Sequence, residues 1–228
     1  MLNSLFTALL HEVLGFASHH PDFLTLEAGQ REELLTNFKM PTALKHYLAH
    51  TDEKHFMQDL RLLLSMLTGT SQNALSIKGN LFFKAVLEFL STTFASKLDE
   101  LPNKFYLLPA AKRMEEVEKL IGSNTLIAEA LKDLLANNSY QEIASTLEQF
   151  SKAVTESDMV LVQTPRDIEP ALKKEIREAL SEVHPLSFPK FQVNRELIGG
   201  FRVFVNGKTK DLSWFARINK ITSIKISS

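Results

Sequence analysis

Residues 197–207 read Leu-Ile-Gly-Gly-Phe-Arg-Val-Phe-Val-Asn-Gly, and residues 208–213 continue as Lys-Thr-Lys-Asp-Leu-Ser. Glycine tolerates backbone conformations and close approaches that a Cβ atom forbids, so Gly199 and Gly200 predict a bulge or a tight turn into a strand. The six residues that follow alternate between two faces, with the period of a half-buried strand. An Asn-Gly turn comes next, and Asp211 and Ser213 then predict the start of a helix.

The residues around this unit predict a small mixed domain. The run Met159–Val162 is short and apolar throughout, which is typical of a central strand. Pro165 and Asp167 predict the start of an amphipathic helix, in which Pro170 is tolerable only in the first turn. A short strand at 191–193 and the Gly-Gly strand follow, and a last helix carries Leu212, Phe215, Ile218 and Ile221. Residues 156–228 are therefore expected to form a β-α-β-β-α domain.

The first 155 residues have the pattern of consecutive helices. Apolar residues recur at spacings of three and four, and proline, glycine or a capping residue separates the segments. The expected helices end before Pro21, run over 27–38, begin at Pro41, run from an N-cap at Thr51 to Gly69, run from Asn80 to before Pro102, and cover 110–121, 126–135 and 140–154. The predicted fold class is α+β, with an all-α helical bundle over 1–155 and the small domain over 156–228.

The composition is that of an ordinary globular protein and excludes several function classes. The 228 residues are 44% hydrophobic and 23% charged, with a net charge of −1, and no apolar run approaches the ~20 residues that span a bilayer. The apolar N-terminus carries His11 and Glu12 and lacks a preceding Lys or Arg, so no signal peptide is expected. The absence of cysteine excludes disulfides, thiol catalysis and zinc-thiolate sites.

The charge is unevenly spread along the chain. Basic residues outnumber acidic ones from Asp158 onward, and the reverse holds before it. This asymmetry suggests two different partner surfaces. Nucleic-acid binding usually shows a concentrated basic patch, which this sequence lacks, so no nucleic-acid partner is expected.

No pattern in the sequence predicts a catalytic, cofactor-binding or metal site. His46 and His50 lie one helical turn apart and His55 follows, but a zinc site needs further ligands, and solvated surface histidines are the favoured interpretation. Neither a phosphate-binding Gly-x-x-x-x-Gly-Lys-Ser/Thr loop nor a Gly-x-Ser-x-Gly motif is present. The chain is thus not expected to be an enzyme or to hold a cofactor.

The order of elements in the C-terminal domain, read with its residues, resembles the delta subunit of F-type ATP synthases, the oligomycin-sensitivity-conferring protein family. The resemblance is carried by Leu197, Ile198, Gly199 and Gly200, by the alternating strand, and by Asp211 and Ser213. It covers about 70 residues closely, and the preceding bundle agrees with the family in class. The chain departs from the family in having Phe6 where a tyrosine is usual. It is also some tens of residues longer than typical bacterial members, and the excess is placed between Pro102 and Thr155.

The resemblance implies a mechanical role in proton-translocating ATP synthesis. Such subunits are non-catalytic parts of the peripheral stalk, or stator, and link the catalytic head to the b subunit. The bundle would bind amphipathic N-terminal helices of the alpha subunits, and the small domain would bind the b subunit. The implied location is the cytoplasmic side of the bacterial inner membrane, with membrane contact only through the complex. By analogy the groove for the alpha subunit would use Leu5, Leu9, Phe83 and Leu87, which would otherwise be ordinary bundle core.

Two aromatic residues of the small domain are further candidates for partner binding. Phe204 lies opposite Phe201, Val203 and Val205 on the alternating strand, so it faces either another helix of the domain or a partner. Trp214, the only tryptophan, either anchors a partner or closes the domain core. The alternative function is a helical peptide-binding adaptor unrelated to ATP synthase, and a small enzyme has no supporting set of residues.

Overall fold

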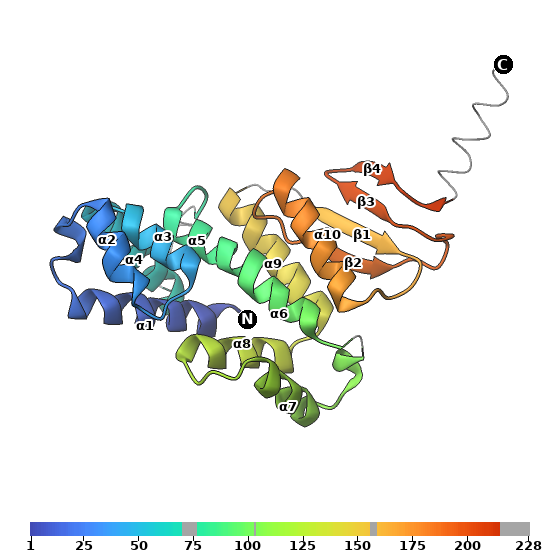
Figure 1. Cartoon of the computed structure of the whole chain (residues 1–228), viewed down its shortest axis with the longest axis horizontal. Helices are drawn as coiled ribbons and strands as arrows, with labels where there is room; N and C mark the ends of the chain where they lie inside the picture. The colour runs from blue at the N-terminus through green and yellow to red at the C-terminus, as the bar shows by residue number, and fades with distance from the viewer. Residues whose placement is uncertain (70–76, 103, 156–158, 215–228) are drawn as a thin grey trace, which may run out of the picture.

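The structure is a computed structural model of the whole chain, and it describes residues 1–69, 77–102, 104–155 and 159–214. Helices α1–α4 lie at one end of an elongated molecule and a four-stranded sheet lies at the other (Figure 1). The fold class is α+β, as the sequence predicts. Below, "helical module" means residues 1–155 and "sheet module" means the described residues from 159 to 214.

The helical module is built from amphipathic helices that share one core. Its elements are α1 (Asn3–His19), η1 (Phe23–Thr25), α2 (Ala28–Thr36), α3 (Thr42–His50), α4 (Glu53–Thr68), α5 (Leu81–Phe89), η2 (Leu90–Phe94), α6 (Ala95–Glu100), η3 (Phe105–Leu107), α7 (Ala110–Leu120), α8 (Leu126–Asn137) and α9 (Tyr140–Thr155). Helix α1 packs against α4 and α8, and α5 packs against α3 and α9. Each predicted helical segment is therefore present.

Capping residues explain several of the helix limits. Gly69 ends α4 in the left-handed conformation at φ +66°, and the Asn80 side chain caps α5 by accepting a hydrogen bond from the Phe83 N–H. The prediction that Thr51 caps α4 is wrong. Asp52 takes that place because its carboxylate accepts from the His55 N–H, while Thr51 ends α3. The helix from Asn80 is one continuous rod that includes the π-helical turn η2.

A polar group and an aromatic cluster lock the interior of the helical module. The buried Asp59 carboxylate accepts a hydrogen bond of 2.7 Å from the Tyr47 hydroxyl and another from Asn80, and so ties α4 to α3 and to the start of α5. On the other side of α5, Phe83 meets Phe6 of α1 and Phe150 of α9, with ring centroids 5.5–6.2 Å apart within this trio. Helix α9 thus closes over the α1–α5 contact.

The sheet module is a four-stranded sheet with one crossover helix. Its elements are β1 (Val160–Thr164), α10 (Pro170–Val183), β2 (Lys190–Val193), β3 (Arg202–Val205) and β4 (Lys208–Asp211). The strand order is β2-β1-β3-β4, with β1 and β2 parallel and the other neighbours antiparallel. The prediction that β1 is central is confirmed. Figure 1 shows α10 between the sheet and α6, and Ile176 and Leu180 pack on Val160, Val162 and Val203.

The structure corrects two details of the predicted C-terminal domain. The helix begins at Pro170 and not near Pro165, because a proline at the first helical position lacks only an N–H that would have no helical partner. Residues 208–211 form a fourth strand paired with β3 across the Asn206–Gly207 turn, in which both residues have positive φ. The predicted last helix, with Phe215, Ile218 and Ile221, falls outside the described residues.

Candidate functional site

The Gly-Gly motif forms a tight corner against the segment that follows β4. Both glycines are left-handed, with φ near +70°. A Cβ atom on Gly200 would lie 2.5 Å from the carbonyl oxygen of Leu212 and 2.8 Å from the Ser213 Cα, so only glycine fits there. The Leu212 N–H donates to the carbonyl of Phe201 at 3.0 Å and closes the corner.

Asp211 holds the other half of this corner. One of its carboxylate oxygens accepts from the Ser213 N–H at 2.9 Å, and the other accepts from Arg202 at 2.8 Å. The hydrogen bonds from the Ser213 side chain and backbone, together with Arg202, lower the pKa of Asp211 to about 2. The Asp211 side chain therefore closes a turn with the Ser213 N–H, and its bond to Arg202 fixes this turn to β3. The Leu-Ile-Gly-Gly and Asp-x-Ser residues thus build the two sides of the same corner.

The corner presents two exposed apolar side chains. Trp214 is 63% exposed, and its ring packs on the backbone of Gly199, where a Cβ would lie 3.3 Å from the ring. Ile198 is 68% exposed, whereas its neighbour Leu197 is buried. We name Ile198 and Trp214 the corner patch. Large apolar side chains held rigidly at the surface are typical of partner-binding anchors.

Phe204 lies on the sheet face opposite α10. Its neighbour Val203 packs with the domain core, while Phe204 pairs across strands with Leu161 and Thr209 and is half-buried. The polar pair Arg202 and Asp211 lies on the same face, as the strand register requires. This face combines an apolar centre with a charged margin.

The four candidates in the helical module lie inside its core. Leu5, Leu9, Phe83 and Leu87 are each at most 1% exposed. In the folded bundle none of them presents a surface to a partner helix. They occupy the positions of ordinary bundle core, which was the other interpretation of their spacing.

A shallow groove between α3 and α5 gives the helical module an accessible surface to which none of these four residues contributes. It has a volume of about 210 Å³ and is lined by Ala43, Leu81 and Ala85, with Lys84 and Glu88 on the α5 side. Leu81 is 49% exposed at the start of α5. The stacked rings of His46 and His50 lie on its α3 side, with centroids 4.4 Å apart.

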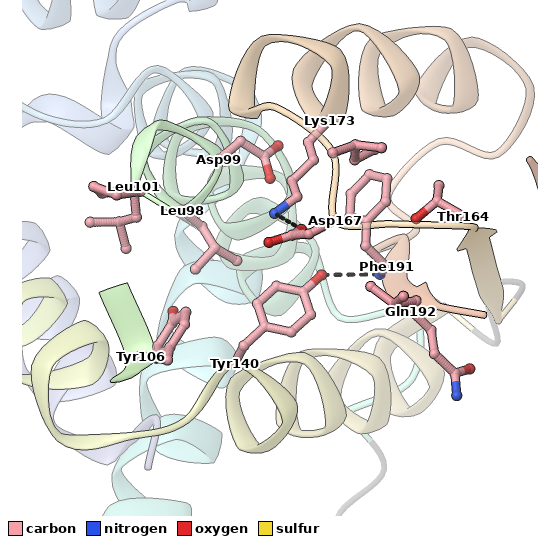
Figure 2. A pocket seen from close by; sticks show the side chains of 13 residues that line it. Leu98, Asp99, Leu101, Tyr106, Tyr140, Thr164, Asp167, Lys173, Phe191 and Gln192 are labelled. Carbon is pink, nitrogen blue, oxygen red and sulfur yellow. Dashed lines mark hydrogen bonds and ion pairs between the residues drawn. The ribbon is translucent and has the colours of Figure 1, made fainter. Parts of the chain in front are cut away.

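A second cavity, of about 230 Å³, lies where the two modules meet (Figure 2). Lys173 and Asp167 form an ion pair of 3.3 Å at this cavity, and the Tyr140 hydroxyl accepts from the Phe191 N–H at 3.1 Å. Its walls come from α6, α9, β2 and the loop before α10. Within the described ranges no three His, Asp or Glu side chains gather in a way that would hold a metal ion.

A comparison of the sequence with models of known protein families gives a match that includes the sheet module. The family model of the ATP synthase delta (OSCP) subunit matches residues 103–224, more than half of the chain. The chain belongs to this family. It is accordingly part of the ATP synthase peripheral stalk, a stator component that is peripheral to the membrane. No curated protein sequence matches it significantly.

The family match covers the segment in which the sequence analysis placed the additional length of this delta-family chain. Residues 103–155, the expected location of the extra length, fall inside the match, and residues 1–102 lie outside it. The matched segment includes α7, α8 and α9 as well as the sheet module. None of the helices in the described ranges has the length and apolarity needed to cross a bilayer.

Proposed function

We propose that this chain joins the catalytic head of an F-type ATP synthase to the b subunit of the peripheral stalk, and that it performs no catalysis itself. The observation that carries the proposal is the family match, which includes the whole Leu-Ile-Gly-Gly and Asp-x-Ser corner. The elongated shape suits a link, since helices α1–α4 and the four-stranded sheet lie at opposite ends of the molecule (Figure 1). The complex would lie on the cytoplasmic side of a bacterial inner membrane, and the chain would divide into functional domains at 155/156.

The b subunit is assigned to the sheet module. The corner patch offers Ile198 and Trp214 on a rigid support, and Phe204 adds an apolar centre on the open sheet face. A helix at the end of the stalk could cover this surface with its apolar face. We expect Trp214→Ala to weaken binding of a C-terminal segment of b, while Val183→Ala, at a similarly exposed position on α10, leaves it unchanged.

The alpha subunit is assigned to the helical module. Because Leu5, Leu9, Phe83 and Leu87 are covered, we propose that an amphipathic helix of the alpha subunit binds the α3–α5 groove through Leu81 and reaches the four core residues only if the bundle opens. Lys84 and Glu88 would set the orientation of the helix through charge pairs at the groove margin.

Calorimetry with a synthetic peptide of the alpha subunit's N-terminal region tests this assignment. The expected result is saturable one-to-one binding that is lost in Leu81→Asp. Leu126→Asp is the matched control, because Leu126 is also 49% exposed and also opens a helix. Absence of binding at about 100 μM peptide, a concentration that detects even weak helix-in-groove contacts, would contradict the assignment of the alpha subunit to this groove.

A further inference from the structure

The loop between α10 and β2 leaves the sheet module and enters the core of the helical module. Phe188 is buried among residues of the helical core, and Leu186 packs against the same core. Leu186 has φ +63°, a conformation that is costly for a residue with a Cβ atom. The Ser151 hydroxyl of α9 donates to the Leu186 carbonyl at 2.9 Å and holds this turn in place.

Arg177 of α10 crosses the same boundary. It is 7% exposed, and its Nε atom donates to a carboxylate oxygen of Asp99 on α6 at 2.5 Å. Its Nη1 atom donates to the carbonyl of Pro189 at 2.9 Å. The guanidinium carbon lies 4.4 Å from the ring centroid of Phe188 and 4.9 Å from that of Phe191, so the cation contacts both aromatic rings.

These contacts depend on the shape of an arginine side chain. The planar fork binds one carboxylate and one carbonyl while the rings cover the cation, an arrangement that a lysine cannot reproduce. Asp99 is itself only 3% exposed, so removing either partner while the modules stay in contact would leave the other charge buried without its partner. The Tyr140–Phe191 hydrogen bond adds a second tie beside it (Figure 2).

We infer that Arg177, Asp99 and the inserted loop 184–189 form an interdomain latch that makes the helical and sheet modules one rigid body. Relative motion is the usual expectation for two domains joined by a short linker. Here the sheet module donates a core residue to its neighbour and is fixed to it by a buried ion pair. The inference concerns the isolated chain, and it stands or falls independently of the partner assignments above.

Distance measurement between spin labels tests the latch on the full chain. The chain has no cysteine, so Glu33→Cys on α2 and Lys208→Cys on β4, both at exposed positions, give two unique labels. A single narrow distance distribution is expected for the latched chain. Arg177→Ala should broaden it, and Arg177→Lys should broaden it too, because the ammonium cannot contact Asp99, Pro189 and the rings together.

Arg202→Ala is the matched control, because it removes an arginine–aspartate pair that lies wholly within the sheet module. It should leave the distribution narrow. If circular dichroism shows that Arg177→Ala does not fold, the same distance measurement is made on Asp99→Asn, which keeps the side-chain shape and removes the charge. This variant should also broaden the distribution. A broad distribution in the unaltered chain, or an unchanged one in a folded Arg177→Ala or Asp99→Asn variant, would overturn the inference.

Discussion

Gly200→Ala should destabilise the sheet module more than any other glycine-to-alanine change in the corner and hairpin. Two costs add at this position. An alanine at φ +71° costs about 1–2 kcal/mol, because the Cβ approaches the carbonyl oxygen of the same residue. The new methyl group would also lie 2.5 Å from the Leu212 carbonyl oxygen, so backbone must move, which costs a further ~1–3 kcal/mol.

The expected total is therefore about 2–5 kcal/mol in the free energy of unfolding. Urea unfolding followed by the fluorescence of Trp214 measures it, because this single tryptophan lies on the corner and reports on the sheet module. The substitution should lower the urea midpoint. It should leave the slope of the transition unchanged, because the slope depends on the surface exposed on unfolding and one added methyl group hardly alters that surface.

Alanine substitutions at two other glycines distinguish the conformational cost from the cost of the steric contact. Gly207 has φ +77° but open space around its Cβ position, so Gly207→Ala should lose only the conformational part, about 1–2 kcal/mol. Gly15 lies in α1 with open space and no positive φ, so Gly15→Ala should stabilise the chain by up to ~1 kcal/mol. Equal losses for Gly200→Ala and Gly207→Ala would refute the contact argument.

Three further predictions concern other parts of the chain. Tyr47→Phe removes the hydrogen bond to the buried Asp59 carboxylate and should cost about 1–3 kcal/mol of stability by urea unfolding at 222 nm. Phe150→Ala removes the ring that contacts Phe6 and Phe83 and leaves a cavity, which should lower the free energy of unfolding by about 3–5 kcal/mol. A loss smaller than that of Tyr47→Phe would contradict this packing argument. The folded-state pKa of Asp211, about 2, lies below its ordinary value, so its stabilising contribution is present above pH ~4 and is lost as the pH falls toward 2. This loss of stability between pH ~4 and ~2, measured by urea unfolding with Trp214 fluorescence, should be absent in Asp211→Asn. An unchanged pH profile in the variant would contradict the proposed stabilisation of the turn by the Asp211 carboxylate.

Local patterns accounted for most elements of the fold. Amphipathic spacing located the helices, and Gly69 and Asn80 marked limits that depend on neighbouring residues only, whereas the start of α10 was predicted near Pro165 and lies at Pro170. The strand β4 was missed because Lys208, Thr209 and Lys210 have no apolar alternation. The Asn206–Gly207 turn did carry the signal, since such a turn joins two antiparallel strands.

The partner-binding residues were harder to predict because a helix face has the same apolar spacing whether it packs in a core or receives a partner. Leu5, Leu9, Phe83 and Leu87 illustrate this, since only tertiary packing shows that all four are covered. The ion pair between Arg177 and Asp99 had no local signal either. The two residues are 78 positions apart, and each belongs to a helix whose charges suggest a solvated face.

The most direct test of the proposed stator link is native mass spectrometry of the chain mixed with two ligands, an N-terminal peptide of alpha and a C-terminal segment of b. The two assigned surfaces lie on different modules, so both ligands should bind at once and give a ternary complex of one copy each. Trp214→Ala should remove only the b segment, and Leu81→Asp should remove only the alpha peptide. Mutually exclusive binding, or binding of neither ligand, would contradict a chain that connects the head to the stalk.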